Sequence, residues 1–351
     1  MSVGRILIMT RTSKILGTGS SFPPHVWDND KLFPLIKSRY ADAYERDWYE
    51  LVFGVNTRHR SLNYETNTLY EGCSDTELAT LAARRALEMA EVDPKEIDFI
   101  MHATMTPDFT VEPDSATDIH KAVGARMDCG VLTFPSTCAG MPTMVNVANA
   151  LISSGACNKV LVTAANVYSG YLEQHHAPMF FTGDGGAAIV LGAASEGDVS
   201  GIIDTFWGVL HDPHGFLTPR SGIAQFCQPS KIQGIVGHSE MNMKNVVDYG
   251  PHALSMVFDW FKKNHGDKIP NLDWVLVHQA TILLKKAVSL ELGVPMEKVP
   301  FDIDHTGNTF AASTGILMDE LNRQGKLKRG DLMLVLSVGT GWTGAAYLMR
   351  W

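Results

Sequence analysis

The two halves of the chain repeat one order of strands, turns and helices, and this duplication limits the folds open to it. The first half runs through an apolar segment at 97–104, the segment 131–140, a helical pattern ending at Gly155, a strand at 159–165 and a glycine-rich segment at 183–192. The second half runs through 272–281, 299–308, a helical pattern ending at Gly325, 331–337 and 339–349. Runs of Val, Ile and Leu without polar alternation are typical of buried strands. We therefore predict a duplicated α/β fold.

The helical segment at 141–154 indicates how the two halves pack. Its sequence, MPTMVNVANALISS, is apolar on nearly every face, and Pro142 is compatible with a first helical turn. Such a helix must be buried on all sides, which a pair of helices between two sheets would achieve. We predict a five-layer αβαβα arrangement, with halves at 12–198 and 199–351.

Composition and charge exclude several classes of function. The chain has 351 residues and a net charge of −9, without a dense basic run for nucleic acid or an anionic membrane. Its five cysteines lack CxxC spacing, so neither a disulfide framework nor a zinc site is indicated. An N-terminal apolar run of four residues and the lack of a long apolar segment predict a cytoplasmic protein that does not cross a membrane.

Three polar residues fall at equivalent or comparable strand ends. Cys138 lies 17 residues before Gly155, and Asn308 lies 17 residues before Gly325, while His278 ends the strand of 272–281. Ligands bind at the carboxyl ends of strands in open α/β sheets. Each residue has a structural alternative: a buried thiol, a core histidine and a helix N-cap. Together they supply a nucleophile and two groups able to stabilise an oxyanion.

Other reactive side chains lack a comparable context. Glu173, His175 and His176 stand close in sequence, but their spacing fits no helical ligand pair, and we predict no metal site. The glycine clusters at 183–186 and 339–341 suit close backbone approach, although they lack the spacing of nucleotide-binding loops. We expect structural roles for the remaining cysteines, which are Cys73, Cys129, Cys157 and Cys227.

Across nearly its whole length the chain resembles the thiolase superfamily and, within it, the β-ketoacyl synthase III group of condensing enzymes. The matching motifs occur in order: ILGTGSSFPP (15–24), GVNTRHR (54–60), ATMTPD (103–108), STCAG (136–140), FTGDGGAAIVLG (181–192), HQA (278–280), GNTFAAS (307–313) and GTGWTGAAYL (339–348). Cys, HQA and GNT-AAS in this order and spacing are highly specific to the group.

The resemblance implies a role for each matching residue. Cys138 would be the acylated nucleophile, and His278 and Asn308 would bind the thioester carbonyl of the second substrate. The N–H groups of Cys138 and Thr340 would form the oxyanion hole. The implied reaction is a Claisen condensation between the acyl group on Cys138 and a malonyl or β-ketoacyl thioester, in fatty acid or polyketide metabolism. Substrates would arrive as thioesters of CoA or acyl carrier protein, no separate cofactor is expected, and the enzyme would be a homodimer.

The sequence departs from the family where CoA would bind. Trp48 matches the aromatic residue that stacks on the CoA adenine, yet Val52 and Leu283 replace two arginines and Thr281 replaces an asparagine. These changes favour a specialised condensation, fed by a carrier protein. Lysines that could meet an acidic carrier, or simply be solvated, are Lys244, Lys285 and Lys286.

Glu112 is a second departure, at a position where the family usually has an apolar residue that reaches the partner subunit's acyl pocket. Superfamily enzymes that join two acyl chains without decarboxylation also have Glu there. Glu112 could act as the base at the substrate α-carbon, or it could be a solvated loop residue.

Other functions remain open at this point: acyl transfer to oxygen or nitrogen, and a noncatalytic subunit of a heterodimer. The presence of His278 and Asn308 favours condensation over simple acyl transfer. The presence of Cys138 is evidence against a noncatalytic subunit.

Overall fold

The two halves of the chain form two sheets with matching strand order. The computed structural model describes residues 11–39, 44–108, 114–171, 176–195, 197–211, 217–219, 239–241 and 243–351. The first sheet has the order β1-β9-β8-β6-β7, and the second has the order β10-β15-β14-β13. In both sheets, the strands at one edge pair in parallel: β8-β6-β7 in the first and β14-β13 in the second. The next strand, β9 or β15, pairs antiparallel with both of its neighbours, and the outer neighbour is the opposite edge strand. The predicted duplication is confirmed.

All strands of each sheet come from one half of the chain. The first sheet comprises β1 (Ser13–Ser21), β6 (Phe99–Thr104), β7 (Gly130–Pro135), β8 (Lys159–Asn166) and β9 (Gly185–Ala193). The second comprises β10 (Gly201–Val209), β13 (Trp274–Val277), β14 (Leu332–Gly339) and β15 (Thr343–Arg350). The predicted boundary between residues 198 and 199 stays a prediction, because the arrangement of strands does not show whether each half folds as a separate domain.

The second sheet lacks a counterpart of β7, which corrects one expectation. Instead of a strand, the segment 299–308 contains the short helix α10 (Ile303–Thr306), and Asn308 makes only an isolated parallel bridge with Thr182. Pro300 has no N–H to give to a sheet, and Gly307 has a φ of +67° that a regular strand does not allow. Asn308 therefore does not end a strand as predicted.

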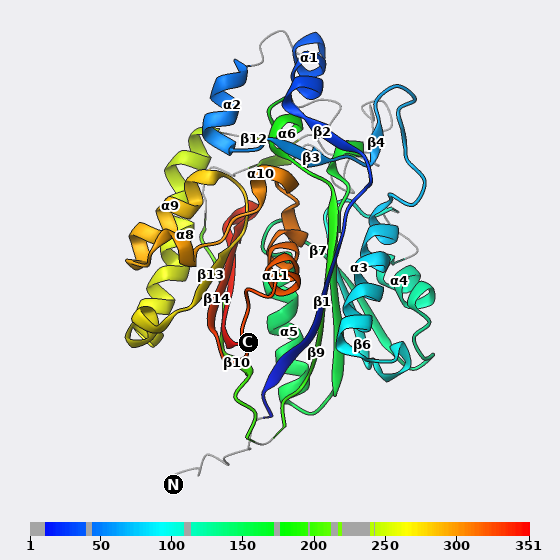
Figure 1. The fold of residues 1–351 in the computed structure, drawn as a ribbon, viewed down its shortest axis with the longest axis vertical. Helices are drawn as coiled ribbons and strands as arrows, with labels where there is room; N and C mark the ends of the chain where they lie inside the picture. The colour runs from blue at the N-terminus through cyan, green and yellow to red at the C-terminus, as the bar shows by residue number, and fades with distance from the viewer. Residues whose placement is uncertain are drawn as a thin grey trace.

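Helices form three layers around the two sheets (Figure 1). On the outer face of the first sheet lie α3 (Asp75–Ala90) and α4 (Ser115–Val123), and on that of the second lie α8 (Met243–His265) and α9 (Ile282–Leu292). Between the sheets lie α5 (Gly140–Ser153) and α11 (Ser313–Arg323), each touching strands of both sheets. The αβαβα layering is confirmed.

Small residues let the central layer pack closely. A Cβ atom on Gly315 of α11 would lie 2.7 Å from Cβ of Ala187 and 2.9 Å from Cε of Met141. A Cβ on Gly140 would lie 2.9 Å from Cβ of Ala311. Because both glycines face residues of the other half, side chains larger than hydrogen would force the halves apart.

A third cluster of elements covers the end of the sheets where the predicted site residues lie (Figure 1, top). It contains β2 (Val26–Asp28), β3 (Thr57–His59), α1 (Asn29–Arg39), α2 (Arg46–Phe53) and α6 (His176–Phe181). Aromatic side chains form its core, and the rings of Tyr49 and Phe180 stack at 4.6 Å.

The remaining strands are β4 (Leu62–Asn63), β5 (Thr68–Leu69), β11 (Leu217–Pro219) and β12 (Ser239–Met241). Short 3-10 helices are η1 (Pro94–Glu96), η2 (Tyr168–Tyr171), η4 (Gly266–Asn271), η5 (Met296–Lys298), η6 (Phe310–Ala312) and η7 (Thr340–Trp342). Within the described ranges, no helix has both the length and the apolar character needed to cross a membrane.

Candidate active site

Cys138 lies between the end of β7 and the start of α5. Its side chain is buried, with 9% exposed. Burial raises the pKa of the Cys138 thiol to about 12, while three hydrogen-bond donors act in the opposite direction: its own N–H, the Thr137 hydroxyl and the N–H of Thr340. Desolvation therefore outweighs the helix N-terminus, and the resting sulfur is a neutral thiol.

The turn that follows β14 approaches Cys138 from the second half. At Gly339, an added Cβ would lie 2.9 Å from Oγ1 of Thr137 and 3.3 Å from the backbone nitrogen of Cys138. Only glycine permits this approach. Interactions with the N–H groups of Cys138 and Thr340 both lower the pKa of the Cys138 thiol, and two such donors beside a nucleophile could serve as an oxyanion hole.

His278 follows β13 directly, as predicted. The side chain is 2% exposed, and neither ring nitrogen has a hydrogen-bond partner among the described residues. Desolvation lowers the pKa of His278 to about 3, so the imidazole is neutral at physiological pH. A neutral imidazole has one N–H donor, and here that donor is available to a substrate oxygen.

Asn308 is held by its backbone and by its own side chain. Its N–H donates to the carbonyl oxygen of Phe181 at 2.8 Å, and its carbonyl accepts from the N–H of Gly183 at 3.0 Å. Its side-chain Oδ1 accepts from the N–H of Phe310 at 2.8 Å. The amide orientation is therefore fixed, and Nδ2 is the group that the side chain can offer as a donor.

Two buried arginines support the segment that holds Asn308. Arg58 and Arg60, both fully buried, donate to the carbonyl oxygens of Phe180 (2.8 Å) and Met179 at the end of α6. Arg60 also donates to the hydroxyl of Thr182 at 3.2 Å. Desolvation, followed by repulsion from Arg60, lowers the pKa of Arg58 to about 9. The last three carbonyls of α6 thus bind Arg60, Arg58 and the N–H of Asn308.

Sequence reasoning missed two residues near the sulfur. Burial, followed by an electrostatic interaction with Cys138, raises the pKa of Tyr168 to about 12. Tyr168 lies two residues after β8, so the rule about strand ends could have found it. Thr137 is the second, and its place beside the sulfur depends on the approach of the 339–341 turn.

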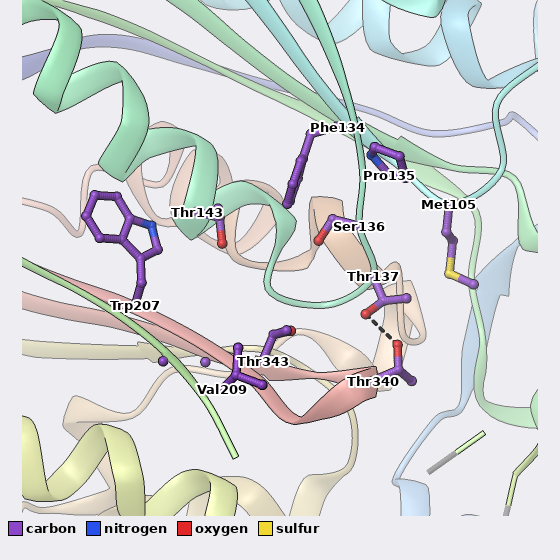
Figure 2. A pocket seen from close by; sticks show the side chains of 12 residues that line it. Met105, Phe134, Pro135, Ser136, Thr137, Thr143, Trp207, Val209, Thr340 and Thr343 are labelled. Atoms are coloured by element: carbon purple, nitrogen blue, oxygen red, sulfur yellow. Dashed lines mark hydrogen bonds between the residues drawn. The ribbon is translucent and has the colours of Figure 1, made fainter. Parts of the chain in front are cut away.

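A cavity of about 680 Å³ lies beside the loop that carries Cys138, with Ser136 and Thr137 in its lining (Figure 2). Met105, Phe134, Trp207 and Val209 form much of its apolar wall. Thr137 and Thr340 lie at one end, and their side chains point toward each other in Figure 2.

The predicted CoA-binding positions lie on α2 and at the start of α9. Trp48 is half-buried and stacks on Tyr44 with ring centroids 4.4 Å apart. The hydroxyl of Thr281 donates to the carbonyl oxygen of Val52, which joins the two helices. Leu283 is 53% exposed, so its replacement of an arginine leaves an apolar surface.

Several residues named in the sequence analysis lie in parts of the chain, or have side chains, that the structure does not describe. Glu112, Glu173, His175 and Cys227 lie outside the described residues, as do the side chains of His176 and Lys244. Lys286 is exposed and Lys285 is half-buried. In the described part of the chain, no group of three or more His, Cys, Asp or Glu residues could hold a metal ion.

Comparisons with known proteins point to one family. The family model for 3-oxoacyl-(acyl-carrier-protein) synthase III matches residues 134–209, and the model for its C-terminal part matches 263–351. Beta-ketoacyl-(acyl-carrier-protein) synthase III of Vesicomyosocius okutanii is 31% identical over 345 residues, which are 97% of this chain and 100% of that protein. The corresponding protein of Sphingopyxis alaskensis is 31% identical over 343 residues, again 97% and 100% of the two chains.

Solved structures have the same fold. The structure of 3-oxoacyl-(acyl-carrier-protein) synthase III from Aquifex aeolicus is 28% identical, with a TM-score of 0.83 and coverage of 97% of this chain and 100% of that one. OleA from Xanthomonas campestris with bound cerulenin has a TM-score of 0.82 at 18% identity, covering 97% and 98% of the two chains. At that identity the likeness concerns the fold alone.

Proposed function

Because the chain belongs to the 3-oxoacyl-(acyl-carrier-protein) synthase III family, we propose that Cys138, His278 and Asn308 carry out the condensation typical of that family. The chain is a ketosynthase III-like condensing enzyme, and therefore an acyltransferase. The observation that carries the residue assignment is the close approach of the Gly339 turn to the backbone nitrogen of Cys138, which brings the N–H of Thr340 within range to lower the pKa of the buried thiol.

In the first half-reaction, the Cys138 sulfur attacks the carbonyl carbon of an acyl thioester. The N–H groups of Cys138 and Thr340 stabilise the negative oxygen of the tetrahedral intermediate. The new C–S bond replaces the bond to the leaving thiol, and the proton of the Cys138 thiol ends on that leaving group. We assign the acyl chain to the cavity lined by Phe134 and Trp207, which reaches Thr137, the neighbour of Cys138 in the sequence.

In the second half-reaction, a malonyl thioester loses CO₂ and its α-carbon attacks the acyl group. The N–H donor of neutral His278 and the Nδ2 donor of Asn308 stabilise the enolate oxygen. A carbon–carbon bond forms as the C–S bond to Cys138 breaks, and the released thiolate takes up a proton from solvent. A neutral donor pair suits this step, because a charged imidazolium would be costly in so buried a position.

We propose delivery by an acyl carrier protein in preference to CoA. Val52 and Leu283 give the rim of the site an apolar surface, continued by Leu51, which is 75% exposed. Aliphatic side chains at these positions bring no charge to the phosphates of CoA but can contact a protein. The same acyl group should therefore transfer faster from a carrier protein than from CoA, and equal or faster transfer from CoA would contradict this preference.

The enzyme is further proposed to be a homodimer that pairs through β7. This strand is the edge of the first sheet, and its Leu132 is 42% exposed. An apolar edge strand is a template for pairing with another chain. A cytoplasmic location agrees with the free thiols of the four described cysteines.

Intact-protein mass spectrometry tests the assignment of the nucleophile. The protein is incubated with acetyl and octanoyl thioesters of CoA and of acyl carrier protein, and the acyl adduct is measured. Cys138→Ala should abolish the adduct, while the matched variant Cys157→Ala should retain it. An adduct that persists on the Cys138→Ala protein would remove the basis of the proposed function.

A further inference from the structure

We propose that the Thr137 hydroxyl is a further catalytic group, which donates a hydrogen bond to the Cys138 sulfur and is aligned for this by the hydroxyl of Thr340. The inference rests on the proposed role of Cys138 as the nucleophile. It assigns roles to the side chains of Thr137 and Thr340, whereas the proposed oxyanion hole uses the backbone N–H groups of Cys138 and Thr340.

The two hydroxyls form an ordered pair across the halves of the molecule. Oγ1 of Thr340 donates to Oγ1 of Thr137 at 2.6 Å, as Figure 2 shows. A hydroxyl has one proton, so a Thr137 oxygen that accepts from Thr340 keeps its own proton for another acceptor. Thr137 directly precedes Cys138, and an interaction between its side chain and the Cys138 thiol lowers the pKa of that thiol.

The backbone keeps the Thr137 hydroxyl in this position. Gly339 packs so closely that a Cβ atom on it would lie against Oγ1 of Thr137 and the backbone nitrogen of Cys138. The hydroxyl of Ser337 donates to the Cys138 carbonyl oxygen at 2.7 Å. Thr137 is also a β-branched residue with few χ1 rotamers, so its hydroxyl is held with little loss of entropy.

The sulfur needs such a donor because few other groups favour its charge. Burial acts strongly against the thiolate, and His278 is neutral in the resting enzyme. A hydrogen bond to a charged atom is stronger than one to a neutral atom. The Thr137 hydroxyl therefore stabilises the thiolate as the thiol proton leaves, and it can continue to donate when the sulfur is released after condensation.

Alkylation of Cys138 by iodoacetamide measures this effect without any substrate. The rate of mass gain at Cys138 is followed from pH 6 to pH 11 in the full-length protein. Thr137→Val, which removes the hydroxyl and keeps the shape, should slow alkylation about tenfold throughout this range, as expected if the thiol pKa, which lies above the range, rises by about one unit. Thr340→Val should have a smaller effect in the same direction, because Thr137 then loses only its alignment.

Two further variants separate catalysis from structure. Thr137→Ser restores the hydroxyl without the methyl group, so it should react close to the parent rate. Thr205→Val makes the same change at a half-buried position of β10 and should leave the profile unchanged. Thermal unfolding of each protein checks that it is folded. If Thr137→Val is unfolded, the comparison of Thr340→Val, which should react more slowly, with Thr137→Ser, which should react close to the parent rate, still decides the question.

The outcome distinguishes this inference from the proposed function. A Thr137→Val profile that coincides with that of Thr205→Val would overturn the role of the hydroxyl while leaving Cys138 as the nucleophile. Loss of reactivity in Thr137→Ser equal to that in Thr137→Val would also overturn it, since the methyl group would then be the part that matters. Acylation of the Cys138→Ala protein would instead contradict the proposed function.

Discussion

The hydroxyl of Ser337 donates to the carbonyl oxygen of Cys138 at 2.7 Å, and both side chains are buried. The bond joins β14 of the second half to the loop that carries the nucleophile in the first. The bond fixes the orientation of the peptide group between Cys138 and Ala139. The position of the sulfur therefore depends on residues that lie about 200 positions away in the sequence.

His278→Ala and Asn308→Ala should slow condensation far more than acylation. Both residues are assigned to the enolate of the second half-reaction, and the loss of one oxyanion donor typically costs about 10²–10³ in rate. Acylation is measured as the mass adduct on Cys138, and condensation as product formed after a malonyl thioester is added. Product formation at the parent rate in both variants would show that the assigned roles are wrong.

Arg60→Met should lower the rate of condensation while sparing acylation of Cys138. The variant leaves the carbonyl of Met179 and the hydroxyl of Thr182 without their donor, and Thr182 pairs with Asn308. An unsatisfied buried acceptor costs about 1–3 kcal/mol, so we expect a fall of about tenfold in kcat, with a smaller fall in Arg60→Lys.

The matched control for Arg60 is Arg84→Met. Arg84 also donates to a carbonyl near the end of a helix, that of Ala122 at 2.7 Å, but it is exposed and remote from Asn308. Equal losses of condensation in the two variants would contradict a positioning role for Arg60.

Asp302→Asn should make the protein less sensitive to rising pH. Burial, followed by repulsion from Glu320, raises the pKa of Asp302 well above its usual value, and neither carboxyl oxygen has a partner among the described residues. Above about pH 4 the unfolded state loses this proton while the folded state retains it, so the free energy of unfolding falls as pH rises toward the folded-state pKa.

The neutral amide of Asp302→Asn removes that contribution. The melting temperature of Asp302→Asn relative to the parent should therefore increase between pH 5 and pH 8. Asp267→Asn, at a side chain that is 77% exposed, should follow the parent at both pH values. A constant difference between Asp302→Asn and the parent across this range would contradict a protonated Asp302.

Glu112→Gln tests whether condensation without decarboxylation occurs. If Glu112 is the α-carbon base, the variant should lose condensation of two non-malonyl thioesters and keep both acylation of Cys138 and malonyl-dependent product formation. Measured product from each substrate pair separates these reactions. An unaffected Glu112→Gln enzyme would make Glu112 a loop carboxylate.

Mixed dimers test whether Glu112 serves the partner subunit's site. Chains carrying Glu112→Gln combined with chains carrying Cys138→Ala should regain one working site per dimer. Because subunit exchange can be shown separately, for example by mass labelling, a mixture without recovered activity would exclude service across the interface.

The parts of the fold that could be predicted are the strands and the central helix whose sequences are too apolar to be exposed to solvent. The runs that became β6, β8 and β14 are too apolar and too short to be exposed helices, and the all-apolar face of α5 required a layer on each side. His278 and Cys138 were found because their residue types follow such strands, in positions where polar side chains converge.

The remainder depends on contacts that arise only when distant segments meet. The segment 299–308 matched the first half in spacing, but Pro300 and Gly307 prevent a strand, so Asn308 is held by α6 instead. The raised pKa of the Cys138 thiol follows from how completely it is buried, and the roles of Arg60 and Thr137 follow from a helix end and a turn that pack beside them. None of these is encoded in a local pattern.

The close packing of α5 and α11 also constrains how this gene can be recombined with those of relatives. A crossover near residues 195–200 would keep each sheet intact but bring helices from different parents into the central layer. There the hydrogen of Gly315 faces Ala187 and Met141 at distances that admit no larger side chain. Viable chimeras should therefore take all five residues of this contact from one parent: Gly140, Met141, Ala187, Ala311 and Gly315. These positions should be inherited together although they lie in both halves of the chain.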